Sequence, residues 1–150
     1  MALLIAACTN RKRVVPRPEM CGRALERGSI EAVSSEWLTR VSAAPPEAEA
    51  ASLYSGRSVT EIRAAVRSAG AELAFLSAGL GVVCATTAVP SYSLTVSGDG
   101  PDAVLRRVTS ACSALDWWLR LEQDSPFGTN LAELAKANST LVARVAQNEG

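Results

Sequence analysis

The chain has 150 residues and zero net charge, with 48% hydrophobic and 20% charged residues. This length and composition predict a single globular domain over residues 1–150 with a buried core, and they exclude a chain that is disordered throughout. Zero net charge removes the general electrostatic argument for nucleic-acid binding, although residues 1–27 hold six basic and two acidic side chains.

The chain contains no histidine, and its four cysteines show no metal-ligand spacing. The missing histidine excludes Ser-His-Asp and Cys-His catalysis and histidine-bound metals. We therefore expect no metal site, and the sequence identifies no cofactor. Scattered cysteines without an export signal favour the reducing cytoplasm.

The first segment is an apolar run over residues 2–7 that ends in the polar stretch 8–13. A lipoprotein signal with Cys8 as the attachment site is the alternative, but here the basic residues follow the apolar run instead of preceding it. No stretch of the chain approaches the ~18 apolar residues that a membrane span needs. We expect a buried strand over 2–7, a polar loop after it, and no association with a membrane.

Two helices are predicted in the first half of the chain. The first covers residues 30–42 and has Ser29 as its N-cap. The second begins with a capping box formed by Ser58 and Glu61 and ends at Gly70.

The second half is expected to continue with a buried strand at 73–76 and an edge-like strand within 91–101. A helix over 102–121 follows, and a last helical segment starts near Asn130 and contains Asn138, where we expect a break or a satisfied buried amide. Strands that alternate with helices predict an α/β layered domain with a small, largely parallel sheet, flanking helices and a helical C-terminal part. Because only about three strands are visible, we expect a version of the domain that is shortened at the C-terminus.

The loop after the first strand is a candidate anion site. It offers the hydroxyl of Thr9, the amide of Asn10 and the cations of Lys12 and Arg13. Such donors beside backbone N–H groups suit a phosphate or a carboxylate. The alternative is a solvated basic turn.

The loop after the second strand carries Ser77 and a G-x-G at Gly79 and Gly81, but it lacks the third glycine of a dinucleotide fingerprint. A plain structural turn is the alternative there. If the two strands are parallel neighbours, both loops face one crevice. We then expect Lys12, Arg57 and Ser77 to act on one ligand.

Five more side chains have two interpretations each. Cys8 is either a nucleophile or a small buried thiol, and Tyr54 and Tyr92 either stack on a base or belong to the core. Trp117 and Leu121 lie opposite the main apolar stripe of their helix, so either that helix is buried on two sides or a protein partner covers this face; the stripe consists of Leu105, Val108, Cys112, Leu115 and Leu119.

Three segments together resemble the YaaA-like superfamily: "ACTNRKR", "LYSGR" and "LAFLSAGLGVV…VPSYSLTVSG". The family pattern has a polar turn of the type C-[ST]-x-x-K after the first strand, then "LY-x-G", then a strand running into "L-S-x-x-x-G-L-[LV]", then "P-x-Y". The resemblance covers residues 3–13 and 53–98. The matching positions are Cys8, Thr9, Lys12, Tyr54, Gly56, Ser77, Gly81, Pro90 and Tyr92.

This superfamily includes the YaaA peroxide-stress proteins, bacterial domains found near defence and nucleic-acid modification genes, and the central domain of archaeosine synthase. The resemblance implies an α/β domain with these loops at one end and a role linked to DNA or a modified nucleobase. It implies no reaction, because the chain lacks the "DPYH"-like motif of uracil-DNA glycosylases and any histidine.

The first functional hypothesis is a cytoplasmic protein of stress response or defence that binds nucleic acid, a nucleotide or a nucleobase. Lys12 and Arg57 would contact phosphate, and Tyr92 would lie near a base. The residues expected at this site are Cys8, Thr9, Asn10, Lys12, Arg13, Tyr54, Gly56, Arg57, Ser77, Gly79, Gly81 and Tyr92.

Two other hypotheses follow from the same residues. One is an enzyme that modifies a nucleobase or nucleotide and uses Asp99 or Asp102 together with Ser77. The other is an interaction module whose protein partner covers the Trp117 face.

Overall fold

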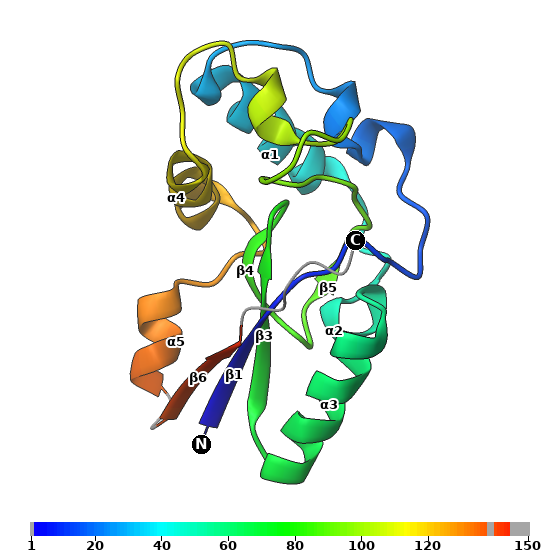
Figure 1. The fold of residues 1–150 in the computed structure, drawn as a ribbon, viewed down its shortest axis with the longest axis vertical. Coiled ribbons are helices and arrows are strands. Elements are labelled where there is room, and N and C mark those ends of the chain that lie inside the picture. The colour runs from blue at the N-terminus through cyan, green and yellow to red at the C-terminus, as the bar shows by residue number, and fades with distance from the viewer. Residues whose placement is uncertain (1, 138–139, 145–150) are drawn as a thin grey trace.

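The computed structural model describes residues 2–137 and 140–144 (Figure 1). In chain order, its elements are β1 (Ala2–Ala7), two 3-10 helices (Pro18–Met20 and Gly22–Ala24), α1 (Ile30–Ala43), β2 (Ala48–Glu49), α2 (Ala50–Leu53), α3 (Arg57–Ala69), β3 (Glu72–Ser77), β4 (Gly81–Cys84), β5 (Ala88–Val89), a 3-10 helix (Val104–Arg107), α4 (Ala114–Asp124), α5 (Leu131–Ala137) and β6 (Thr140–Arg144).

The main sheet has four strands in the order β4-β3-β1-β6. β1 is parallel to both β3 and β6, whereas β3 and β4 are antiparallel, as are β2 and β5, which form a separate pair. The protein is therefore α/β with mixed sheets, and a largely parallel sheet is not supported. The reason is local: a tight turn joins β3 to β4, and a link this short reverses the chain instead of crossing over the sheet.

β1 and β3 are neighbours in the parallel orientation, which meets the condition for their loops to face one crevice. Ala7 pairs with Leu76 at the end of the ladder, and the N–H of Cys8 donates to the Leu76 carbonyl over 3.0 Å. The loops that follow β1 and β3 therefore leave the sheet at the same edge.

The two faces of this sheet are covered by different helices. Leu3 and Ile5 of β1 belong to a small cluster against which Leu131 of α5 packs, whereas Phe75 of β3 lies in the main core with Ile62 of α3. Figure 1 shows α3 and α5 on opposite sides of the sheet. Side chains that alternate along a strand produce this division.

Two of the predicted helix termini have the expected capping residues, and one does not. The Ser29 hydroxyl accepts from the N–H of Ala32 over 3.2 Å, and Gly70 ends α3 with a φ of 62°. The predicted capping box at Ser58 is wrong: α3 begins at Arg57, so Ser58 lies in its first turn, and the N-cap is Gly56, with a φ of 117°. Glycine tolerates this backbone conformation. Because glycine has no side chain, the start of α3 has no side-chain cap.

The long helix predicted over 102–121 is wrong. A 3-10 helix and an irregular stretch precede α4, because backbone groups in the middle of that segment bond elsewhere. The N–H of Gly28 donates to the Arg107 carbonyl over 3.0 Å, and the N–H of Thr109 donates to the Gly28 carbonyl over 2.9 Å. α4 then starts at its own capping box, formed by Ser113 and Asp116.

The faces of α4 are the reverse of the predicted ones. Trp117 and Leu121 are fully buried in the core of the chain, whereas Leu115 and Leu119 are 64% and 47% exposed. The prediction that a partner covers Trp117 and Leu121 is therefore wrong. The predicted apolar stripe includes residues before α4 that are not α-helical, so it does not describe the face that α4 buries.

The edge strand predicted within 91–101 is absent: this stretch makes single backbone pairings, Ser93 with Cys21 and Thr95 with Ala103. The residues after Asn130 form α5 as expected, and the Asn130 side chain accepts from the N–H of Ala132 over 2.8 Å. The helical C-terminal part does not continue, because β6 adds a strand beside β1. The predicted break at Asn138 lies outside the described residues.

Among the described helices, none has the length and apolar composition required to cross a bilayer.

Candidate functional site

The loop after β1 is held against the residues that follow α2. The N–H of Arg13 donates to the Leu53 carbonyl over 2.9 Å, and the N–H of Ser55 donates to the Arg11 carbonyl over 3.0 Å. The Thr9 hydroxyl lies 2.9 Å from the Ser55 carbonyl. The loop is therefore an ordered short pairing of two chain segments and not a free solvated turn.

This pairing places Lys12 directly beside Tyr54 and over the ring of Tyr92. The Lys12 ammonium lies 4.3 Å from the centroid of the Tyr92 ring and 5.8 Å from that of Tyr54, and it donates to the Thr9 carbonyl over 3.3 Å. A cation over an aromatic face is stabilised by about 0.5–2 kcal/mol. The aromatic contact holds the ammonium in place and leaves donor capacity for a ligand.

Desolvation lowers the pKa of Lys12, because burial removes water from the charged form. The negative charge of Asp102 and of the ionised forms of Cys8 and Cys21 acts in the opposite direction. A half-buried ammonium in this state gains more from an anionic partner than a fully hydrated lysine does.

A chain of buried hydroxyls lies beneath Lys12. The Tyr92 hydroxyl is 2.8 Å from the Tyr54 hydroxyl and hydrogen-bonds to the Ser77 hydroxyl, which also accepts from the N–H of Leu80 over 3.0 Å. Burial raises the pKa of both tyrosines, so both stay neutral at physiological pH. Their rings are completely buried, which makes them core residues that support Lys12 and not open platforms for a base.

The turn between β3 and β4 is fixed from two sides by tryptophan indoles. The N–H of Trp37 donates to the Gly79 carbonyl over 2.7 Å, and that of Trp117 donates to the Ala78 carbonyl over 2.8 Å. A Cβ at position 79 would lie 2.7 Å from the Tyr92 ring, and Gly81 has a φ of 89°. The two glycines therefore serve packing and chain reversal, and the structural-turn interpretation of the G-x-G fits them.

Lys12 and Tyr92 both line a pocket of about 590 Å³. We call it the Lys12 pocket; its lining residues are Asn10, Lys12, Val15, Pro16, Pro18, Cys21, Arg23, Ala24, Tyr92 and Ser93.

One wall of the Lys12 pocket is fixed by Asp102. Arg23 donates to this carboxylate from Nε over 2.9 Å and from its terminal nitrogen over 2.7 Å, and the Ser93 hydroxyl donates over 2.7 Å. Burial alone would raise the pKa of Asp102, but the hydrogen bonds from Arg23 and Ser93 outweigh it and lower the pKa to about 2. Both carboxylate oxygens are engaged, so Asp102 acts as a structural anion and not as a free base.

Sequence reasoning missed Arg23, Cys21 and Ser93 as pocket residues. Arg23 belongs to the basic N-terminal segment, which was the available signal. Nothing in the local sequence links Arg23 to Asp102, because this contact spans 79 residues.

Several expected site residues lie away from the Lys12 pocket. The Arg57 side chain is 85% exposed and pairs with Glu61 over 3.0 Å, and Arg13 is exposed. Ser77 connects to Lys12 only through Tyr92. The structure therefore links Lys12 to the buried Ser77 only indirectly, and Arg57 is not among the residues that line the Lys12 pocket.

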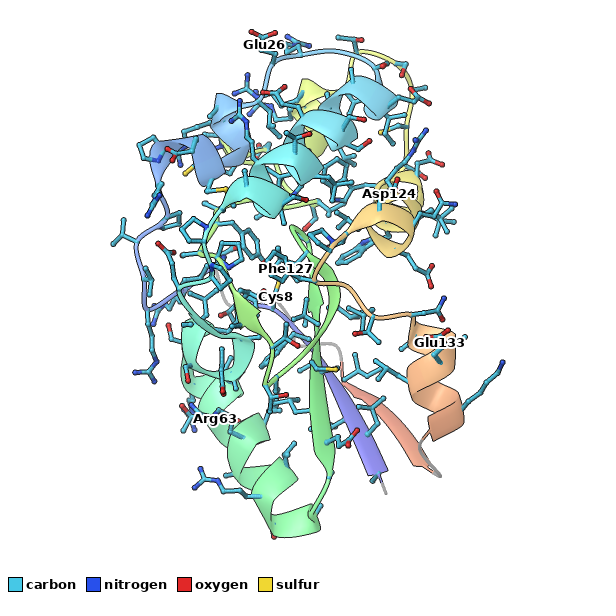
Figure 2. All side chains as sticks on the ribbon, turned by 180° about the vertical axis from the view of Figure 1, so that it is seen from behind. Cys8, Glu26, Arg63, Asp124, Phe127 and Glu133 are labelled. Carbon is cyan, nitrogen blue, oxygen red and sulfur yellow. The ribbon has the colours of Figure 1, made fainter. Side chains whose placement is uncertain are left out.

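Cys8 is half-buried and packs against the main core. Figure 2 shows it near the middle of the molecule. Within the part of the chain that the structure describes, no group of three or more Cys, Asp or Glu side chains is gathered in a way that could hold a metal ion.

Comparisons with protein-family models, with curated proteins and with solved structures gave no significant match. The resemblance to the YaaA-like superfamily therefore rests on the sequence motifs alone.

Proposed function

We propose that this protein is a cytoplasmic member of the YaaA-like superfamily that binds a nucleotide or a nucleobase, free or within nucleic acid, in the Lys12 pocket. Its role would lie in stress response or defence, as the resemblance implies. The observation that carries the binding proposal is the half-buried Lys12 ammonium, held over the Tyr92 ring at the border of the pocket.

The chemistry of the pocket suits a ligand with an anionic group and an apolar ring. Lys12 supplies the cation, and Asn10 supplies an amide that can donate or accept. Val15, Pro16 and Pro18 supply apolar surface, and ligand pockets of about 300–1,000 Å³ are typical of small molecules. A phosphate beside a ring that packs on the prolines meets both requirements.

The lowered pKa of Lys12 makes this proposal testable by pH. A bound anion favours the protonated amine, so binding weakens as pH rises through the pKa of Lys12. Because that pKa lies below the ordinary value of 10.5, the loss of affinity begins at a lower pH than for an exposed lysine.

The experiment is a thermal-shift screen of the purified protein against nucleotides and free bases, followed by titration calorimetry of each compound that raises the melting temperature. A ligand at one hundred times its Kd stabilises the folded state by about 2.7 kcal/mol. Lys12→Met keeps the length of the side chain and removes the charge, so it should abolish the shift. Arg57→Met removes an exposed charge outside the pocket and should leave the shift unchanged.

Two outcomes contradict the proposal. One is a screen in which no compound shifts the melting temperature, and the other is a Lys12→Met variant that binds the selected compound as tightly as the wild type.

Modification of a nucleobase or nucleotide is the second candidate function, and the lowered pKa of Lys12 favours it, because a desolvated lysine loses its proton more readily than an exposed one and can act as a base. Asp102 is not available for that role, since Arg23 and Ser93 occupy its oxygens. Incubation of the selected compound with the protein, followed by mass spectrometry, distinguishes an enzyme from a binding protein.

A further inference from the structure

A second pocket, of about 540 Å³, is rich in arginine and separate from the Lys12 pocket. We call it the arginine pocket; it is lined by Arg27, Pro101, Leu105, Arg106, Arg107 and Val108. Three of these residues carry a permanent positive charge, and none is acidic.

The backbone fixes this cluster although the arginines come from two distant segments. The two hydrogen bonds that Gly28 makes with Arg107 and Thr109 tie the residue after Arg27 to the end of the 3-10 helix Val104–Arg107. Arg106 and Arg107 form the last turn of that helix. Main-chain contacts therefore hold the two segments that carry these arginines against each other, and all three arginines line one pocket.

Their charges are not neutralised within the described part of the chain. Arg106 donates to the main-chain carbonyl of Asp99, whereas the side chains of Arg27 and Arg107 have neither an ion pair nor a hydrogen bond there. By contrast, Arg23 pairs with Asp102 in the neighbouring pocket. Like charges held at short range repel one another, and an anion bound among them relieves that repulsion.

The arginine pocket and the Lys12 pocket are both lined by residues that adjoin the Arg23–Asp102 ion pair in the sequence. Arg23 and Ala24 line the Lys12 pocket, and Arg27 follows three residues later. Pro101, which precedes Asp102, lines the arginine pocket. A polynucleotide offers a separate phosphate group to each pocket, whereas a mononucleotide with one phosphate does not.

We propose that the arginine pocket binds the phosphodiester backbone of a single-stranded polynucleotide, one nucleotide of which occupies the Lys12 pocket. This inference rests on the proposed function and makes its ligand a polymer instead of a mononucleotide. Guanidinium groups bind phosphate through two parallel hydrogen bonds, and the apolar floor formed by Pro101, Leu105 and Val108 suits the sugar and base that adjoin a phosphate.

The test measures the affinity for a fluorescein-labelled, mixed-sequence single-stranded oligonucleotide by anisotropy over a series of salt concentrations. The variant is Arg27→Gln with Arg107→Gln. For single strands the log–log salt slope changes by about 0.7 for each phosphate contact, so losing two contacts should flatten it by about 1.4. Calorimetry with the four mononucleotides should show unchanged affinity, because the Lys12 pocket is intact.

The matched control is Arg63→Gln with Arg67→Gln, which removes the same charge from α3. Figure 2 shows Arg63 at the opposite end of the molecule from Glu26, the neighbour of Arg27. The control should keep the wild-type slope. An equal flattening in both double variants indicates general charge attraction and overturns the proposal.

Inorganic pyrophosphate separates the two sources of a phosphate group. If Arg27→Gln with Arg107→Gln weakens pyrophosphate binding but leaves oligonucleotide binding unchanged, the pocket serves a free phosphate compound and the polynucleotide proposal is wrong. If Lys12→Met leaves mononucleotide binding intact while the arginine variant still flattens the salt slope, the proposed function of the Lys12 pocket fails and the backbone contacts of the arginine pocket stand.

Discussion

The position of the Lys12 ammonium depends on side chains to which Lys12 is not bonded. Its ammonium lies over the Tyr92 ring, and the position of that ring depends on the hydroxyl contacts with Ser77 and Tyr54. All three hydroxyl-bearing residues are fully buried. Polar groups in such an interior stabilise a unique arrangement only when each one has a partner.

Tyr92→Phe should therefore destabilise the protein more than Tyr54→Phe. The first removes the middle hydroxyl of the chain and takes one partner from each neighbour, which costs about 1–3 kcal/mol. The second removes the end of the chain and leaves the Tyr92–Ser77 contact, at a cost of about 1 kcal/mol. Urea denaturation gives both values, and an equal loss in the two variants would show that Ser77 adds nothing to the network.

At the scale of elements, the β3–β4 turn is the point where α1 and α4 meet the sheet. Each helix contributes one tryptophan, Trp37 or Trp117, whose indole N–H bonds a carbonyl of the turn. The same turn packs against the Tyr92 ring through Gly79. The positions of the two helices therefore affect Tyr92, which lines the Lys12 pocket, through the β3–β4 turn.

Gly79→Ala should destabilise the protein by about 1–3 kcal/mol, because the new methyl group has no space. Its Cβ would lie 2.7 Å from two carbons of the Tyr92 ring and 3.1 Å from the Trp37 ring. Gly100→Ala is the matched control, since a Cβ there meets nothing within 4 Å. Thermal denaturation should show a clear fall for the first variant and a change within about 0.5 kcal/mol for the second. Similar melting temperatures for the two would mean that the turn adapts.

A second element-scale prediction concerns helix starts. Ser113 caps α4, with its hydroxyl accepting from the N–H of Asp116 over 3.3 Å, so Ser113→Ala should cost about 0.5–2 kcal/mol. Ser58 lies inside the first turn of α3 and caps nothing in the structure. Ser58→Ala should therefore change stability by less than about 0.5 kcal/mol. Chemical denaturation of both variants tests this, and a larger loss at Ser58 would restore the capping box that the sequence predicted.

At the scale of the whole molecule, Asp102 joins chain segments that are far apart in the sequence. Its carboxylate accepts from Arg23, 79 residues away, and from Ser93. Arg23 and Ser93 line the Lys12 pocket, and Pro101, which precedes Asp102, lines the arginine pocket. Loss of this anion should therefore loosen both pockets together.

The acid stability of the protein should report this contact. Asp102 has a folded pKa of about 2 against an ordinary 3.8, so its contribution is present above pH 3.8 and disappears as pH falls through 2. Asp102→Asn should lower the melting temperature at neutral pH, and the difference from the wild type should shrink between pH 4 and pH 2. Melting curves over a pH series measure this; a difference that is constant with pH would show that Asp102 has the same pKa in the folded and unfolded states.

Local patterns in the sequence were sufficient for the elements whose signals lie within a few residues. The buried strand over 2–7, the cap at Ser29, the cap at Asn130 and the left-handed end at Gly70 all agree with the structure. Each depends on hydrogen bonds between near neighbours or on the polarity of a short run. The sequence also predicts that both β1 and β3 are short, apolar and buried, whereas their pairing as parallel neighbours is decided by the structure.

Only the tertiary structure decided the faces of α4, the strand β6 and the ion pair of Asp102. Trp117 is buried because the carbonyl of Ala78 accepts its indole N–H, a contact that spans 39 residues. β6 is a strand because β1 offers it a parallel partner, although its residues also fit a helical stripe. The Lys12 pocket also depends on the tertiary structure. Its motifs can be recognised in short segments of the sequence, but its walls are formed by contacts between segments that are far apart in the chain. Contacts between distant segments depend on which surfaces meet when the chain folds. Residues throughout the sequence determine those surfaces, so no single stretch predicts them.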